Sequence, residues 1–337
     1  MKQILVVDDN VTSLRQISAQ LTSNYELLLA KSGALALQIC LQEKPDLILL
    51  DIEMPEMDGF ETLSRIKMNP FLAQIPVIFL TGNHDTETEV KGLVSGARDF
   101  ITKPVEKSIL LHRIELHLRF STYQTYLENT VKEMSDSVVA SFAELIECRD
   151  EKTGGHVVRT SRYVERLGRE LLKKKMFTKE LSEAELDLFI RAAPLHDIGK
   201  IAISDRILLK PEQLNDGEFN IMKRHATIGA EILENMYERT PTQSYLRYAM
   251  LIAVSHHERY DGKGYPKGLA GSDIPLCGRI MAVADVYDAL VDNRVYRKAM
   301  PHAEACRVLQ EGKGAQFDPE IIEIFESCNL DFKQITH

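Results

Sequence analysis

Histidines and aspartates in the second half of the chain have the types and spacing needed to bind metal ions. Five histidines and two aspartates stand in short motifs: His156 after Gly154-Gly155, His196 beside Asp197, His225, the pair His256-His257, and Asp285. Imidazole and carboxylate together suit first-row transition metals, whereas Mg²⁺ or Ca²⁺ would call for oxygen ligands throughout. These ligands exceed what one tetrahedral ion needs, so we predict two ions bridged by Asp197. Two ions roughly 3.5–4 Å apart are suited to in-line attack at phosphorus.

Each of these histidines, taken alone, is more simply explained as a surface residue or a hydrogen-bonded core residue, and His225 by itself is weak evidence. The adjacent pair is different, because neighbouring residues on a helix point about 100° apart. His256 and His257 therefore more naturally address one site from a helix end or a loop. The other histidines lie outside the pattern and are predicted to be surface or packing residues: His84, His112, His117, His302 and His337.

A second group of polar residues follows short apolar runs in the first third of the chain: Asp8, Asp9, Asp51, Thr81 and Lys103. If these runs are parallel strands, their carboxyl ends share one sheet edge and three carboxylates converge there. Like charges that close suit a hard cation such as Mg²⁺, which would help an aspartate oxygen attack phosphorus. The hydroxyl and the ammonium could then receive the new phosphoryl oxygens. For Asp8 and Asp9 alone, turn or helix-cap roles are the simpler explanation.

The apolar pattern also predicts the elements that position these two groups. In residues 1–120, strand-like runs at 4–7, 47–50 and 77–80 alternate with helical spacing at 14–21 and 34–41. This alternation predicts a doubly wound α/β domain with a parallel sheet. After Cys148 the pattern changes to long helices separated by loops that contain glycine and proline, which predicts an all-α second domain. A length of 337 residues agrees with two domains.

A stretch without glycine or proline joins the two predicted domains. Its apolar positions follow mostly three- and four-residue steps and predict one amphipathic helix: Phe120, Leu127, Val131, Met134, Val138 and Leu145. We expect much of this helix to pack on the second domain, with a dimerising coiled coil as the alternative. A homodimer is therefore left open.

Composition excludes several classes of partner. The net charge of −9 argues against DNA and anionic lipid, although positive charge gathered in one cleft could still hold a small anion. No secretory signal or bilayer-spanning apolar run occurs. The five cysteines are scattered, without a Cys-x-x-Cys spacing, so we expect a cytoplasmic protein with reduced thiols.

The first 120 residues resemble a response-regulator receiver domain, including the segment Asp51-Ile-Glu-Met-Pro-Glu-Met-Asp-Gly59. The resemblance implies that Asp51 accepts a phosphoryl group from a histidine kinase. It further implies that Asp8 and Asp9, together with Asp51, hold Mg²⁺. Thr81 and Lys103 would contact the phosphoryl group, and Phe100 would be the aromatic switch.

The second domain resembles the HD-GYP family, a branch of the HD phosphohydrolases that hydrolyses cyclic dinucleotides, chiefly cyclic di-GMP. The matching strings are Leu195-His-Asp-Ile-Gly-Lys200, His256-His-Glu-Arg-Tyr-Asp-Gly-Lys-Gly-Tyr-Pro266, Thr153-Gly-Gly-His156, Gly229-Ala-Glu after His225, Arg279 to Leu290, Arg294-Val-Tyr-Arg297 and Phe317-Asp-Pro319. The resemblance implies metal ligation by His156, His196, Asp197, His225, His256, His257 and Asp285. Asp197 would be catalytic, Lys200 would neutralise a phosphate oxygen, and the GYP loop (Asp261, Gly262, Gly264, Tyr265 and Pro266) would lie beside the pocket.

Two positions depart from the family pattern. Some members bind a third metal through a glutamate four residues before the first histidine, where this chain has Lys152, next to Glu151. We therefore expect two ions, with iron or manganese favoured and nickel or zinc as alternatives. The second departure is Gln316, where many relatives carry histidine, and no consequence follows from it.

These features predict a receiver at 1–120, a helical linker at 121–145 and an HD-GYP domain at 146–337. The expected reaction converts cyclic di-GMP to pGpG, to GMP, or to both, under control of phosphorylation at Asp51. The alternatives are an HD hydrolase of mononucleotides or guanosine tetraphosphate, a silent cyclic-dinucleotide sensor, and a module that docks on a diguanylate cyclase. A phosphodiesterase specific for cyclic GMP-AMP is a further alternative. Cyclic di-GMP and cyclic GMP-AMP are both compatible with the sequence, as are activation and inhibition by phosphorylation and a monomer or a homodimer.

Overall fold

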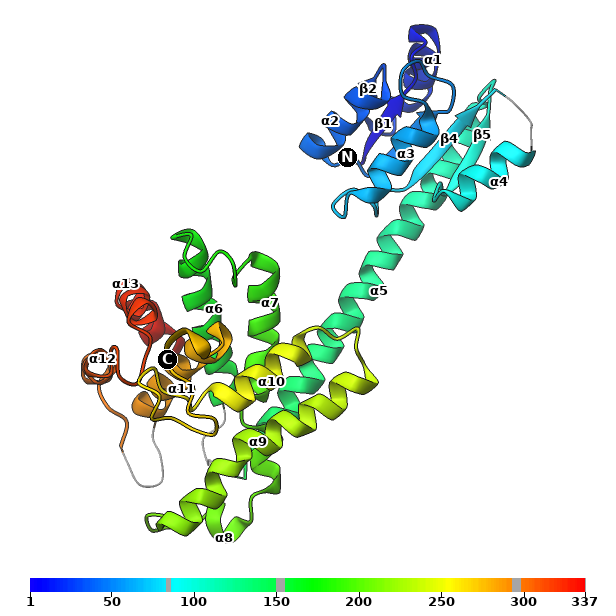
Figure 1. The fold of residues 1–337 in the computed structure, drawn as a ribbon. Helices are drawn as coiled ribbons and strands as arrows, with labels where there is room; N and C mark the ends of the chain where they lie inside the picture. Colours follow the sequence, from blue (N-terminus) through cyan, green and yellow to red (C-terminus); the bar gives the residue numbers. More distant parts are fainter. Residues whose placement is uncertain (83–85, 150–154, 293–297, 337) are drawn as a thin grey trace. The chain divides into compact units, whose positions relative to one another are not determined.

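The computed structural model describes residues 1–82, 86–149, 155–292 and 298–336. The chain divides into two compact units, Met1–Val131 and Lys132–His337, and each is described by itself. Figure 1 labels their helices and strands. Among the described residues, no helix is both long enough and apolar enough to cross a lipid bilayer.

The first unit holds a parallel sheet covered by helices on both faces, as predicted (Figure 1). Its strands are β1 (Gln3–Val7), β2 (Glu26–Ala30), β3 (Leu47–Asp51), β4 (Val77–Thr81) and β5 (Asp99–Thr102). The helices between them are α1 (Val11–Leu21), α2 (Gly33–Glu43), α3 (Gly59–Met68) and α4 (Thr86–Val94). In the described residues the strand order is β2-β1-β3-β4-β5. Strand β2 is added on one side of β1, and the later strands are added on the other side, so the order of addition reverses between β1 and β3. Ligands of such sheets bind at that switch point.

The three strands predicted from the sequence, β1, β3 and β4, are the three central strands of the sheet. All five residues of β3 and of β4 are buried, so both strands read as continuous apolar runs. Strand β2 lies at the sheet edge, and its residues are exposed or half-buried except for Ala30. Strand β5 is only four residues long and has two polar ends. Neither of these two strands was assigned from the sequence.

Helix α5 (Lys107–Glu147) is one continuous helix of 41 residues and includes the predicted linker. The six apolar positions on which the linker prediction rested are all exposed. Ala143 and Ile146 are buried instead, and Val139 packs against the core of that unit. Lys132 and Asp136 form ion pairs there with Asp187 and Arg191. The packing face of α5 therefore differs from the face that the apolar spacing indicated.

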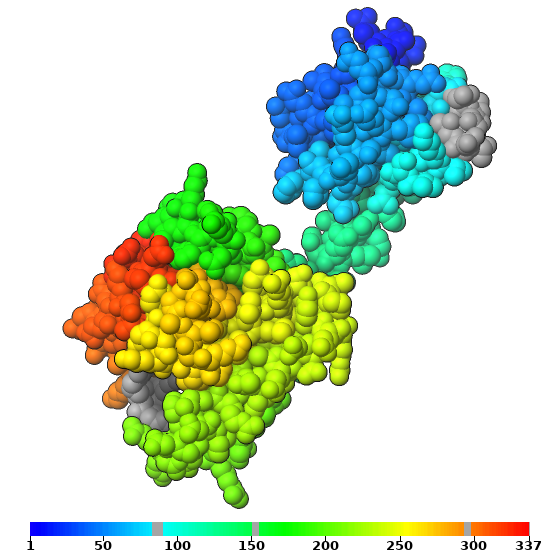
Figure 2. Space-filling model, in the orientation of Figure 1, coloured from blue at the N-terminus to red at the C-terminus, as the bar shows by residue number. Residues whose placement is uncertain are grey.

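The second unit is helical, as predicted (Figure 1). After the end of α5 its helices are α6 (His156–Lys173), α7 (Glu183–Ala192), α8 (Asp205–Leu208), α9 (Asp216–Arg239), α10 (Tyr245–Ser255), α11 (Leu276–Val291), α12 (His302–Glu311) and α13 (Pro319–Thr336). Short 3-10 helices are η1 (Ala193–Leu195), η2 (Ile198–Ala202) and η3 (Gly271–Asp273). Helices α9 and α10 pack side by side, as the yellow-green and yellow segments of Figure 2 show.

Helix α11 is the centre of the second unit. Twelve of its sixteen residues are buried, from Leu276 to Leu290, and nine of these join one apolar core with α6, α7, α10 and α13. Tyr163 of α6 stacks on Phe332 of α13 and meets Tyr287 of α11 edge-on. This core holds fixed the helices from which the histidine and aspartate side chains project.

Candidate functional site

The HD motif lies on a sharp connection that two glycines bring against helix α9. His196 and Asp197 stand between η1 and η2. A Cβ atom on Gly199 would lie 2.0 Å from the carbonyl oxygen of His225 and 2.5 Å from the backbone nitrogen of Gly229. Only glycine permits so close an approach. Gly199 therefore lets the chain bring Asp197 next to His225.

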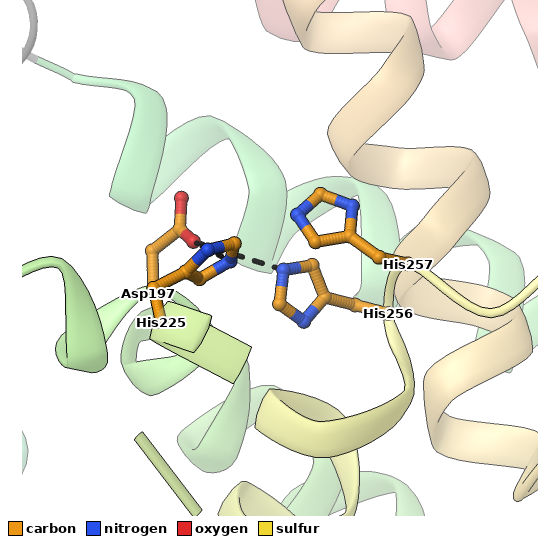
Figure 3. Close-up of side chains that lie close together, drawn as sticks. All are labelled: Asp197, His225, His256 and His257. Atoms are coloured by element: carbon orange, nitrogen blue, oxygen red, sulfur yellow. Dashed lines mark ion pairs between the residues drawn. The ribbon is translucent and has the colours of Figure 1, made fainter. Parts of the chain in front are cut away.

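Four side chains from three separate segments converge on one point (Figure 3): Asp197, His225, His256 and His257. Each offers one ligand atom, and these atoms all lie within 4.8 Å of one another. The Oδ1 atom of Asp197 is 3.2 Å from Nε2 of His225 and 3.7 Å from Nε2 of His256. His256 is the C-cap residue that follows Ser255, the last residue of α10, and His257 comes next in the loop, the helix-end position expected for the adjacent pair.

A second group lies beside the first and contains His156, His196 and Asp285. Nε2 of His156 is 3.5 Å from Nε2 of His196 and 3.6 Å from Oδ1 of Asp285. The Oδ2 atom of Asp197 is 3.4 Å from Nε2 of His196. One carboxylate thus presents one oxygen to each group, which is the arrangement that a bridging ligand requires.

Backbone contacts orient three of the imidazoles toward the centre. Nδ1 of His196 donates to the carbonyl oxygen of Ala193 (3.0 Å), Nδ1 of His225 to that of Met222 (2.7 Å), and Nδ1 of His256 to that of Ile252 (3.0 Å). In a neutral ring this leaves Nε2 as an acceptor. Nε2 of His225, Nε2 of His256 and Oδ1 of Asp197 are buried without a hydrogen-bond partner. Facing acceptors of this kind fit divalent metal ions.

Burial and charge set the protonation of the site. Burial lowers the pKa of His256 and holds that of His257 well below the ordinary value for histidine. Burial acts to raise the pKa of Asp197, but Lys200 and the neighbouring histidines hold it well below the usual range. His256 and His257 are therefore held neutral and Asp197 ionised, the forms that bind a metal. At His225, burial lowers the pKa, but the neighbouring Asp197 raises it above the ordinary value. The ammonium of Lys200 lies 2.9 Å from Oδ2 of Asp197, at the edge of the centre.

Asp288 orients His156 and was not singled out in the sequence. Its Oδ2 atom accepts from Nδ1 of His156 at 2.7 Å, and Arg159 donates to both of its oxygens at 2.7 and 2.8 Å. Burial lowers the pKa of His156, but the bond to Asp288 and the nearby carboxylates raise it to about 9. The signal available in the sequence is the three-residue spacing from Asp285, which places both carboxylates on one face of α11.

Replacing Asp288 with asparagine is expected to weaken metal binding at the group of His156, His196 and Asp285 by about 10–100-fold, because this carboxylate fixes the ring of His156. Calorimetric titration of metal-free protein with Mn²⁺ measures the change. Asp331→Asn is the matched control, since Asp331 also accepts from an arginine, Arg166, but far from the metal ligands in sequence and on another helix. Unchanged Mn²⁺ affinity in Asp288→Asn would contradict this role.

The GYP loop is held against the histidine pair by Glu258. The buried carboxylate of Glu258 accepts from the backbone nitrogens of Lys267 (2.7 Å) and Leu269 (3.0 Å). A Cβ on Gly264 would lie 2.3 Å from the backbone nitrogen of Arg259, so this position requires glycine. The ring of Tyr265 is 4.7 Å from that of His257, centre to centre. The loop therefore forms one wall beside the metal ligands.

In Glu258→Gln, one of the two buried N–H groups should lose its acceptor, because the new amide nitrogen cannot accept. We expect the free energy of unfolding to fall by about 1–3 kcal/mol. Faster hydrogen exchange at Lys267 and Leu269 should accompany this loss. Glu234→Gln, at an exposed position of α9, serves as the control. Equal exchange rates in both variants would show that Glu258 does not hold the loop.

Helix α5 reaches the metal centre through its last residue. Both carboxylate oxygens of Glu147 are shielded from solvent. Glu147 lines a pocket together with His156, His196, Asp197 and Lys200, and its charge contributes to the raised pKa of His156. Glu147 belongs to none of the sequence motifs, because its place beside the pocket depends on where α5 ends.

The receiver residues also meet at one sheet edge. Asp8, Asp9 and Asp51 present carboxylate oxygens within 4.8 Å of one another. The ammonium of Lys103 is 2.7 Å from Oδ2 of Asp8 and 2.9 Å from Oδ2 of Asp51. Burial is the largest influence on Asp51 and raises its pKa, against the opposing effect of Lys103. Three converging carboxylates offer the oxygen ligands that Mg²⁺ prefers.

Thr81 adjoins this pocket through Lys103, whereas Phe100 packs in the apolar core of the same unit. Thr81 is the buried last residue of β4, and its carbonyl oxygen accepts from the backbone nitrogen of Lys103 at 2.7 Å. The ring of Phe100 is buried, 5.3 Å from that of Phe79. Their predicted roles as phosphoryl contact and aromatic switch remain predictions.

Several predicted positions lie outside the described residues: His84, Glu151, Lys152, Thr153, Gly154, the segment 294–297 and His337. Gln316 is described, and its carbonyl oxygen accepts from the backbone nitrogen of Tyr260 at 3.2 Å. This contact ties the segment after the histidine pair to the loop before α13.

Comparison with known proteins agrees with both units. A family model described as "HD domain" matches residues 140–321, and one described as "Response regulator receiver domain" matches residues 4–115. This chain belongs to the response regulators that carry an HD domain. The HD domain implies a divalent-metal site, and the receiver implies a kinase partner.

Three relatives illustrate the similarity. A protein of Vibrio cholerae serotype O1 named "Probable cyclic di-GMP phosphodiesterase" is 43% identical and matches 96% of this chain and 76% of its own. The "Cyclic di-GMP phosphodiesterase response regulator RpfG" of Xanthomonas campestris pv. campestris is 35% identical, over 98% of this chain and 89% of its own. The "3'3'-cGAMP-specific phosphodiesterase 2" of Vibrio cholerae serotype O1 is 40% identical, over 58% of this chain and 35% of its own.

Proposed function

We propose that this chain hydrolyses a cyclic dinucleotide, with cyclic di-GMP as the substrate, at a binuclear metal centre controlled by phosphorylation of Asp51. The observation that carries the proposal is the pair of adjacent ligand groups that share Asp197. Two relatives that match most of this chain are named for cyclic di-GMP. In this proposal residues 1–120 are the receiver, 121–145 the linker and 146–337 the catalytic domain.

The metal ligands divide between two ions in this proposal. His225, His256 and His257 would hold one ion, and His156, His196 and Asp285 would hold the other, with Asp197 shared between them. When bound, two such ions stabilise the attacking and leaving oxygens of an in-line displacement at phosphorus. Iron or manganese is proposed, with nickel and zinc as alternatives, because imidazole and carboxylate suit all four.

The remaining residues bind and orient the substrate. The ammonium of Lys200, at the edge of the centre, neutralises a phosphate oxygen. Addition of one water across one phosphodiester bond opens the ring and gives linear pGpG, and a second hydrolysis gives GMP. Asp51, with Asp8 and Asp9 holding Mg²⁺, accepts the phosphoryl group from a histidine kinase, and Thr81 and Phe100 repack in response.

A second candidate substrate is the mixed ring cyclic GMP-AMP. Its support is the relative named as specific for 3'3'-cGAMP. The two rings share their phosphodiester bonds and differ in one base, so the metal centre alone does not separate them. Docking on a diguanylate cyclase through the GYP loop is compatible with either substrate.

The test is turnover by anaerobically purified protein reconstituted separately with Fe²⁺, Mn²⁺ and Zn²⁺. Cyclic di-GMP and cyclic GMP-AMP are each supplied, and pGpG and GMP are separated by chromatography. We expect pGpG from cyclic di-GMP with at least one metal. Faster turnover of cyclic GMP-AMP would make the mixed ring the substrate in place of cyclic di-GMP. No product from either ring would favour a catalytically silent sensor of cyclic dinucleotides.

A further inference from the structure

We propose that Phe219, Lys223 and Tyr265 form an aromatic shelf on which a purine base of the cyclic dinucleotide stacks. This inference rests on the proposed function and extends it to how the substrate is recognised. It assigns a role to Phe219 and Lys223, which belong to none of the sequence motifs described above.

The aromatic shelf begins at the metal ligands. The ring of Tyr265 lies 4.7 Å from the ring of His257 and is inclined to it by 32°. A substrate phosphate at the centre would lie beside this ring.

Phe219 continues the shelf away from the metal ligands. Its ring meets Tyr265 edge-on, with centroids 6.2 Å apart and planes at 80°. Phe219 lies in the first turns of α9, the helix that also carries His225, so its backbone is fixed relative to the centre. Its side chain is nevertheless 45% exposed. An aromatic ring held by a rigid helix with so much surface open is available for stacking.

Lys223 places a positive charge near both rings. It follows Phe219 by four residues on α9, and its ammonium lies 5.1 Å from the Phe219 centroid and 5.9 Å from that of Tyr265. A single exposed aromatic residue would need no explanation. Two rings and Lys223 therefore lie beside a centre at whose edge Lys200 is paired with Asp197 at 2.9 Å. That combination suits a ligand with flat bases and anionic phosphates.

Phe219→Ala should raise KM for the cyclic dinucleotide roughly 5- to 150-fold, the loss of one base–aromatic contact, with kcat and metal content unchanged. Phe219→Tyr should restore KM, because it keeps the ring. Phe142→Ala is the matched control, since Phe142 is also an exposed phenylalanine of the second unit.

A second measurement isolates the base. GMP and ribose 5-phosphate carry the same phosphate, and only GMP has a purine. Calorimetry with the metal-loaded protein should show tighter binding of GMP by the wild type, and Phe219→Ala should remove most of that advantage without changing the affinity for ribose 5-phosphate.

The outcomes separate this inference from the proposed function. Unchanged KM and an unchanged GMP advantage in Phe219→Ala would overturn the aromatic shelf even if turnover is normal. Equal loss of GMP binding, ribose 5-phosphate binding and metal would show a structural role and also overturn it. If the wild type hydrolyses neither ring, the proposed function fails, and the GMP comparison still decides whether the shelf binds a purine.

Discussion

Asp197→Asn is expected to abolish hydrolysis, with kcat falling at least about 10³-fold. The two ions together supply several kcal/mol of transition-state stabilisation, and each 1.36 kcal/mol is a factor of ten in rate. Asparagine keeps the shape of Asp197 but removes the charge that faces both ligand groups at 3.2 and 3.4 Å. Because the lost charge belongs to both groups, metal content should fall at both.

Metal analysis by plasma mass spectrometry and chromatographic assay of pGpG are the two measurements for Asp197→Asn. The control is Asp273→Asn, which removes an exposed carboxylate from the same unit. A variant that keeps full metal content but loses turnover would limit Asp197 to a catalytic role. An active Asp197→Asn enzyme would refute the bridging assignment.

Asp51→Asn is expected to lose all phosphoryl uptake. An amide has no anionic oxygen to attack phosphorus, and the nearest other carboxylates, Asp8 and Asp9, are proposed to hold the cation. Incubation with acetyl phosphate or a phosphoramidate and Mg²⁺, followed by intact mass measurement, should show a phosphorylated wild type and an unmodified variant. Chelation of Mg²⁺ should prevent modification of the wild type as well.

The same variant tests the coupling between the units. Turnover of the wild type should change when the phosphodonor is added, whereas turnover of Asp51→Asn should not. Glu53→Gln, which alters another carboxylate lining the same pocket, should remain phosphorylated and responsive. If the donor changes turnover equally in all three proteins, phosphorylation of Asp51 is not the controlling event.

Short-range motifs explain why most of the site could be predicted from the sequence. His196-Asp197 and His256-His257 are adjacent in the chain, so their types alone indicate a shared centre. Two ions sharing Asp197 were predicted, but which histidines belong to which group could not be, because that depends on how α6, α9 and α11 pack. The roles of Asp288 and Glu258 were not predicted for a related reason. From its residue type alone, a carboxylate that orients a ligand or a loop cannot be told from one that faces solvent.

Burial explains only part of what the sequence revealed of the fold. The central strands β3 and β4 are buried throughout and stand out as apolar runs. Residues 27–30 of edge strand β2 are an apolar run as well, but a run of four does not by itself separate a strand from a buried helix segment. Helix α5 was predicted as a helix, and the apolar positions that indicated it are exposed, while Val139, Ala143 and Ile146 face the second unit. Its small buried residues, such as Ala143, contribute little to an apolar pattern that larger exposed residues dominate.

The last turn of α5 has a consequence for insertions near its end. Each residue turns an α-helix by about 100°, so one residue inserted between Ala143 and Glu147 would rotate Glu147 away from the pocket that both residues line. An insertion of seven residues would restore the direction to within roughly 20° but would move Glu147 about 10 Å along the helix axis. Any change of length in this last turn is therefore expected to remove the carboxylate of Glu147 from the pocket.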